Sequence, residues 1–101
     1  FMAFSQAYTE YTGQPVSTFG GHGWDSLGWV IEALETLPDG LTLAEQRAAV
    51  RDYIETNIKD WPGTAGVFNI TPDDHYGLTE ESFTWFKVEE GSFVPFPGEE
   101  W

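Results

Sequence analysis

The aromatic residues of the first twelve positions repeat every three or four residues, which is the spacing of one face of a helix. They are Phe1, Phe4, Tyr8 and Tyr11. Gly13 favours the end of this helix, and Pro15 cannot continue it. We therefore expect a helix over residues 1–12 and an extended segment over residues 16–19. Because no capping residue precedes the first apolar position, we expect a fragment of a longer protein or, alternatively, a frayed terminal helix.

A second apolar stripe begins near residue 21 and again has helical spacing. Its positions are Trp24, Leu27, Ile31 and Leu34, with Val30 alongside. Glu32 and Glu35 lie off the stripe. The pattern predicts a second helix over residues 21–36, which the turn residues 37–40 end.

A third helix is predicted after this turn. Thr42 and Glu45 have the spacing of a capping box, in which each side chain bonds to the backbone N–H of the other residue. The expected buried side of the helix consists of Leu43, Val50, Ile54 and Ile58. The sequence Trp61-Pro-Gly63 should stop the helix, because proline cannot continue it.

The pattern then changes from helical to extended. The segment of residues 66–70 is short, apolar and rich in β-branched side chains, which predicts a strand. Residues 71–82 are polar and rich in turn formers, so an ordered loop is expected there rather than a strand or helix. Two more strands are predicted over residues 83–88 and 92–96, joined by a glycine-containing turn at 89–91.

This order gives one partial α/β domain over residues 1–101, with three helices followed by about three short strands. A lone hairpin is marginal in water, and several apolar faces lack an expected partner. We therefore expect a missing surface, supplied by the rest of the same polypeptide or by a second copy of the chain. Self-association of the chain through its uncovered apolar faces follows from the same argument.

Charge and composition exclude several classes of function. The 101 residues include 17 Asp and Glu against 4 Lys and Arg, a formal net charge of −13, which would repel a nucleic-acid backbone. The sequence has no cysteine, so disulfides, thiolate zinc sites and thiol nucleophiles are excluded. No apolar run approaches the ~20 residues that span a bilayer. The acidic residues are expected to form a solvated surface.

Four stretches, taken in order, carry a family resemblance. They are residues 4–15, the run Ser17-Thr-Phe-Gly-Gly-His-Gly-Trp-Asp-Ser-Leu27, the segment from Trp61-Pro-Gly-Thr-Ala-Gly-Val-Phe68 to residue 78, and the hairpin 86–94. Together they resemble the C-terminal third of the solute-binding proteins of ABC importers, of the leucine/isoleucine/valine-binding type. That family has the type I periplasmic binding protein fold.

The resemblance implies two Rossmann-like α/β lobes, joined by three crossover segments, that close on a small solute such as a branched-chain amino acid. The implied partners are the rest of the same polypeptide and an ABC permease in the membrane. The implied location is periplasmic or extracellular, with a lipid anchor possible. Neither catalysis nor a cofactor is implied.

The resemblance also implies that the loop before the second helix reaches the ligand cleft. The aromatic residue at Phe19 would pack on the ligand, and Gly20, Gly21 and His22 share its loop. An aromatic face beside glycines suits such a site, because it offers apolar area and close backbone approach. The alternative is that Phe19 packs against the entry of the helix and that His22 has a structural role.

Other chemistry receives less support from the sequence. The run Gly21-His-Gly-Trp-Asp-Ser26 is similar to the oxyanion loop of α/β hydrolases, but no G-x-S-x-G elbow accompanies it. Asp25 is instead expected to favour the positive end of its helix. Residues 73–75, with Glu80 and Glu81, leave a loose calcium site open, although an Asp-rich turn is preferred and no metal is expected.

One function from another class stays open. A small, self-contained acidic α+β module could bind a protein through its aromatic surface.

Overall fold

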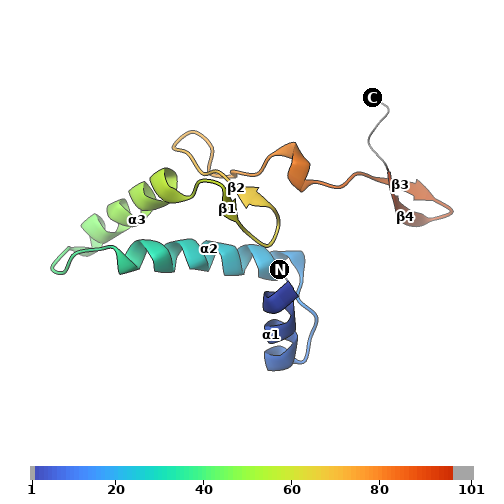
Figure 1. Ribbon diagram of the computed structural model, residues 1–101, viewed down its shortest axis with the longest axis horizontal. Coiled ribbons are helices and arrows are strands. Elements are labelled where there is room, and N and C mark those ends of the chain that lie inside the picture. Colours follow the sequence, from blue (N-terminus) through green and yellow to red (C-terminus); the bar gives the residue numbers. More distant parts are fainter. Residues whose placement is uncertain (1, 97–101) are drawn as a thin grey trace.

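The computed structural model describes residues 2–96. Its helices are α1 (Met2–Thr12), α2 (Thr18–Glu35) and α3 (Leu43–Asn57), and its strands are β1 (Trp61–Pro62), β2 (Val67–Phe68), β3 (Phe86–Glu89) and β4 (Ser92–Pro95). A 3-10 turn, η1, covers Glu80–Ser82. Figure 1 shows α2 and α3 side by side, α1 across the N-terminal end of α2, and the β3–β4 hairpin projecting away from the helices. The expected class, three helices followed by short strands, is confirmed.

The start of α2 differs from the prediction. The helix begins at Thr18 rather than near residue 21, so residues 18 and 19 are helical and the expected extended segment is shorter. The physical reason is Ser17, whose backbone is extended and whose side-chain oxygen accepts a hydrogen bond from Gly20 N. Serine is a strong N-cap residue, and it starts the helix ahead of the apolar stripe.

The predicted capping box of α3 is confirmed, since Thr42 and Glu45 bond to each other's backbone N–H. Its buried side is confirmed in part. Ile58 is fully buried just after the helix, and Val50 and Ile54 are half-buried. Leu43 is 61% exposed, so its assignment was wrong: it is the first residue of α3, where the described elements leave it uncovered.

The core lies where α2, α3 and the β1–β2 hairpin meet. Ile58, Phe68 and Ile70 are buried there, and half-buried side chains pack against them. The Trp29 ring meets Phe68 edge to face, with 5.0 Å between ring centroids, and meets Trp61 in the same way at 5.7 Å. Aromatic pairs in this geometry contribute beyond the area that they bury.

The first predicted strand is shorter than expected and has an unexpected partner. Within residues 66–70 only Val67–Phe68 is a strand, paired antiparallel with Trp61–Pro62, where the sequence indicated no strand. Proline is tolerated in so short a ladder because it lies at a sheet edge. Residues 71–82 were expected to form a loop without helix. The prediction was wrong for Glu80–Ser82, which form the 3-10 turn η1.

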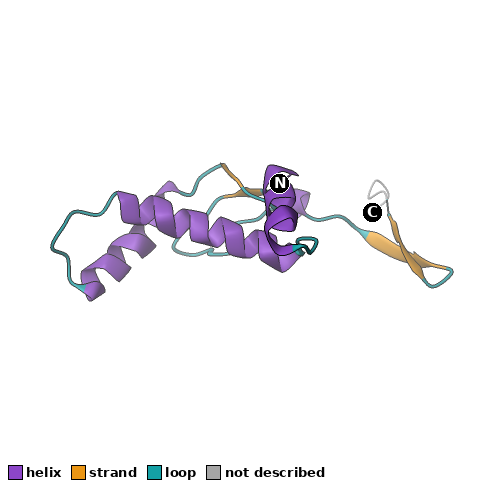
Figure 2. Ribbon diagram, turned by 90° about the horizontal axis from the view of Figure 1, so that it is seen from below, coloured by secondary structure: helices purple, strands orange, loops and turns teal. Residues whose placement is uncertain are grey.

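The β3–β4 hairpin is confirmed, with slightly shorter strands than predicted. Glu90 and Gly91 both have positive φ in its turn, the conformation that tight hairpins require. The register sets Phe86 opposite Pro95 and Val88 opposite Phe93, which places these four residues on one face. The opposite face carries an ion pair between Lys87 and Glu89. The hairpin is therefore amphipathic, and Figure 2 again shows it standing apart from the helices.

Most of the apolar stripe of α2 faces outward, although the Trp24 ring stacks on Phe4 of α1, with 4.8 Å between ring centroids. The members of the stripe are 47–57% exposed: Trp24, Leu27, Ile31 and Leu34. The molecule exposes 7914 Å², against about 5,800 Å² for a compact monomer of its mass, and measures 60 × 38 × 19 Å. The expectation of uncovered apolar surface agrees with these observations.

Candidate functional site

A hollow of about 400 Å³ opens beside the N-terminal end of α2. Three parts of the chain form its walls: the start of α2, the turn between β1 and β2, and the loop that runs from residue 76 to residue 83.

The first wall is the start of α2. Ser17 caps the helix and lines the hollow, and Gly21 N bonds to its carbonyl oxygen at 3.1 Å. Gly21 is buried, and a Cβ added there would lie 2.5 Å from Thr64 Oγ1. A residue without a side chain is therefore needed for α2 to approach Thr64 so closely. His22 follows in the helix and lines the hollow, half-buried.

The second wall is the tip of the β1–β2 hairpin, formed by Thr64 and Ala65. Thr64 donates two hydrogen bonds to Asp25 Oδ2, from its backbone N at 2.8 Å and from Oγ1 at 2.7 Å. The expected role of Asp25 at the positive end of its helix was therefore wrong. Asp25 lies beyond the first turn of α2, and its carboxylate is committed to the hairpin.

The third wall is the loop that carries Tyr76, Leu78, Ser82 and Phe83. The rings of Tyr76 and Phe83 lie nearly parallel, with centroids 6.3 Å apart and 10° between their planes. A Cβ added at Gly66 would lie 2.3 Å from Ser82 Oγ and 3.2 Å from Leu78 Cδ2. Gly66 therefore lets this loop pack directly on the β1–β2 hairpin.

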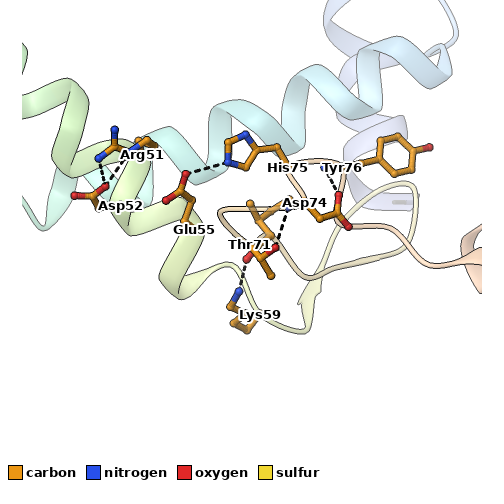
Figure 3. A network of polar contacts seen from close by, with 9 residues as sticks. Arg51, Asp52, Glu55, Lys59, Thr71, Asp74, His75 and Tyr76 are labelled. Carbon is orange, nitrogen blue, oxygen red and sulfur yellow. Dashed lines mark hydrogen bonds and ion pairs between the residues drawn. The ribbon is translucent and has the colours of Figure 1, made fainter.

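One polar contact joins this third wall to α3, and others hold the loop and the segments beside it. His75 Nε2 lies 2.9 Å from Glu55 Oε1, and Asp74 Oδ1 accepts hydrogen bonds from the backbone N of Tyr76 and Gly77. Lys59 Nζ also donates to the carbonyl of Ile70, just before the loop. Figure 3 shows the contacts of His75 with Glu55 and of Asp74 with Tyr76, and the Tyr76 ring points away from the His75–Glu55 pair. The loop is thus held from one side while Tyr76 lines the hollow on the other.

The structure brings together only part of the predicted ligand-contacting set. Within residues 2–96, the hollow's lining includes Gly21 and His22 but neither Phe19 nor Gly20. Phe19 is 87% exposed on the first turn of α2. Gly20 faces the segment before the helix, since a Cβ added there would lie 3.1 Å from Val16 Cγ2.

Sequence reasoning missed the second and third walls. The available signal was the pair Gly63 and Gly66 on either side of Thr64-Ala65, a pattern typical of a tight turn that neighbouring groups approach closely. Nothing in the local pattern indicated that α2 would be the neighbour. That contact joins residues 39 positions apart.

The hollow offers hydroxyl groups and an imidazole beside apolar surface. The hydroxyl groups belong to Ser17, Thr64, Tyr76 and Ser82, and the apolar side chains to Val16, Ala65, Leu78 and Phe83. None of the described lining residues is Asp, Glu, Lys or Arg. This lining suits a small solute with an apolar part and hydrogen-bonding groups. Residues outside the described hollow would have to neutralise any full charges on such a solute.

Two absences within residues 2–96 bear on other functions. No group of three or more His, Cys, Asp or Glu side chains is placed to hold a metal ion. None of the helices there combines the length and the apolar character that crossing a membrane requires.

Comparisons with known proteins point to one class. No protein-family model matches the chain, and no curated protein matches it. Among solved structures it is similar to an extracellular ligand-binding receptor from Rhodopseudomonas palustris, with 33% identity and a TM-score of 0.66 over 95% of this chain. Two receptors of the same description from Rhodopseudomonas palustris HaA2 are 36% and 34% identical over 92% and 91% of this chain, with TM-scores of 0.68 and 0.63.

The chain spans about a quarter of the length of these receptors, 26–27% in each case. The likeness extends over nearly all of this chain, and the neighbours are described as receptors that bind ligands outside the cell. This agrees with the expected resemblance to a solute-binding protein. The descriptions specify neither a leucine/isoleucine/valine-binding type nor an importer.

Proposed function

We propose that these residues form part of a periplasmic or extracellular solute-binding receptor that serves an ABC importer and is not an enzyme. The observation that carries the proposal is the likeness to ligand-binding receptors, at 33–36% identity over more than nine-tenths of this chain. The outward apolar stripe of α2 supports it, because a receptor several times longer would supply a cover for that face. The permease would be the receptor's membrane partner.

The proposed solute is a branched-chain amino acid or a related small compound. The lining of the hollow supports this class, since hydroxyl groups and His22 lie beside Leu78 and Phe83. The groups that would fix an amino acid's carboxylate and ammonium are proposed to lie in the rest of the receptor. The solute would be trapped by closure of two lobes about a hinge.

The proposed ligand contacts are Phe19, Gly20, Gly21 and His22. Gly21 and His22 would contact the solute from the hollow. Phe19 would contact it from outside the hollow, because its exposed ring is free to meet a solute or an opposing lobe that closes over it.

The test uses the native polypeptide that contains these residues. Its mass is measured first, then the solutes that co-purify with it are identified by mass spectrometry, and calorimetry measures binding of L-leucine. A polypeptide several times heavier than 11.4 kDa that carries a small solute is the expected result. A native product of about 11.4 kDa that binds no solute would instead favour the acidic protein-interaction module, whose support is the exposed aromatic surface.

Two further measurements address the site. The isolated 101 residues should show no measurable amino-acid binding, since most of the pocket would lie elsewhere. In the native polypeptide, Phe19→Ala should weaken solute binding by at most about 2–4 kcal/mol, as for a buried aromatic contact. Tyr11→Ala is the matched control, because Tyr11 is equally exposed but lies in α1. Unchanged affinity in Phe19→Ala would remove Phe19 from the site.

A further inference from the structure

Asp25 is a buried carboxylate whose described partners lie in another element. It is 1% exposed, and Thr64 donates two hydrogen bonds to it, one from the backbone N and one from the side-chain hydroxyl. Hydrogen bonds to a carboxylate are stronger than those between neutral groups, and a buried carboxylate that loses its donors is costly. Asp25 therefore links α2 to the tip of the β1–β2 hairpin through two hydrogen bonds to one buried carboxylate oxygen.

Two glycines make this contact possible. A Cβ at Gly21 would lie 2.5 Å from Thr64 Oγ1, and a Cβ at Gly63 would lie 2.8 Å from Asp25 Oδ2 and 2.4 Å from the Phe68 ring. Neither position has room for a side chain. The helix and the hairpin tip thus approach each other closely at two points, Gly21 against Thr64 and Gly63 against Asp25.

The same approach sets the shape of the hollow. Gly21 and His22 of α2 form one wall, and Thr64 and Ala65 form the facing wall. We infer that Asp25 is a positioning residue for the solute site: it holds the Thr64-Ala65 tip at a fixed separation from His22 without contacting the solute itself. That a solute binds in this hollow rests on the proposed function. The Asp25–Thr64 contact is a feature of the structure and does not depend on that proposal.

The test compares five variants of the native polypeptide. Asp25→Asn and Asp25→Ala weaken or remove the acceptor, and Thr64→Val removes the hydroxyl donor but keeps the backbone donor. Thr64→Ser keeps both donors and serves as the rescue. Thr9→Val is the matched control, since the Thr9 hydroxyl bonds to Ser5 O within the exposed α1 helix. Hydrogen exchange followed by mass spectrometry reports on residues 62–67, with α3 as the internal reference.

Asp25→Ala and Thr64→Val should raise amide exchange over residues 62–67 by about tenfold or more, with α3 unchanged. Thr64→Ser and Thr9→Val should behave like the wild type. If Asp25→Ala does not fold, Thr64→Val against Thr64→Ser decides, because these two differ in the hydroxyl. The inference is overturned if exchange does not change, or if Thr64→Ser is as disturbed as Thr64→Val.

A binding measurement separates this inference from the proposed function. Where the wild type binds L-leucine, Asp25→Asn should weaken that binding by about tenfold, while Thr9→Val leaves it unchanged. Unchanged binding in Asp25→Asn would overturn the positioning role. Where the wild type binds no L-leucine, the amino-acid form of the proposed function fails, and the exchange measurement still decides whether Asp25 holds the hairpin tip.

Discussion

Trp61 donates its indole N–H to Glu32 Oε1 across 3.1 Å, which joins β1 to α2 over a separation of 29 residues. Glu32 lies on the side of α2 that faces the core, together with Trp29 and the buried Ala33. The apolar stripe on the other side of the helix is left facing out. An amphipathic helix usually packs its apolar stripe on the core, but within residues 2–96 α2 leaves most of this stripe exposed.

Trp61→Phe should lower the free energy of unfolding by about 1–3 kcal/mol, because it leaves the half-buried Glu32 carboxylate without this donor. Urea unfolding followed by circular dichroism measures the change. Trp85→Phe is the matched control, since Trp85 is 63% exposed and should tolerate the change. Equal stability losses in the two variants would show that the Trp61–Glu32 bond contributes nothing.

The outward stripe of α2 should cause the 101-residue chain to self-associate, because burial of Leu27, Ile31 and Leu34 between copies removes apolar area from water. Sedimentation velocity should detect species heavier than 11.4 kDa at micromolar concentrations. The double variant Leu27→Ser/Leu34→Ser should shift the population toward the monomer. Leu43→Ser, which changes an exposed leucine on another helix, should not, and a monomeric wild type would contradict the prediction.

The capping box of α3 should give stability that depends on pH. Hydrogen bonds from the Thr42 side chain, and then from its backbone, hold the pKa of Glu45 below its ordinary value of 4.5. Because the folded pKa is depressed, this contribution is fully present above about pH 4.5 and is lost as the pH falls through the folded pKa. An NMR titration of the Glu45 carboxyl carbon measures the pKa of Glu45 in the folded protein. Thr42→Ala should return the pKa toward 4.5, and a wild-type value at or above 4.5 would refute the prediction.

His75→Ala should loosen the loop that carries Tyr76 without unfolding the protein. His75 is exposed, so removing its contact with Glu55 should cost less than about 1 kcal/mol of global stability. The backbone amides of Tyr76 and Gly77 should nevertheless exchange faster, because the loop loses its attachment to α3. His22→Ala changes the other histidine and is the control. If the amides of Tyr76 and Gly77 exchange at equal rates in the two variants, His75 does not hold the loop.

Short-range features of the fold could be predicted from the sequence. The Thr42–Glu45 capping box and the positive-φ turn at Glu90-Gly91 depend on residues within a few positions of one another, so the pattern contains what is needed. The Ser17 cap was also present in the sequence and was missed because the apolar stripe starts later.

The candidate site depended on contacts that no local pattern specifies. The pairing of Asp25 with Thr64, and of Trp61 with Glu32, joins segments that are far apart in the chain. Periodicity identified the stripe of α2 correctly, but it does not say which side of a helix finds a partner. Two of the four predicted contact residues line the hollow, and whether any of the four meets a solute stays a prediction.

The projecting β3–β4 hairpin has a thermodynamic consequence. A two-stranded ribbon whose Phe86, Val88 and Phe93 side chains are more than half exposed gains little from burial, so it is only weakly coupled to the melting of the helical core. On heating, the ribbon should lose order well before α2 and α3 separate. For the isolated 101 residues we therefore expect two unfolding transitions, and one melting temperature would not describe both.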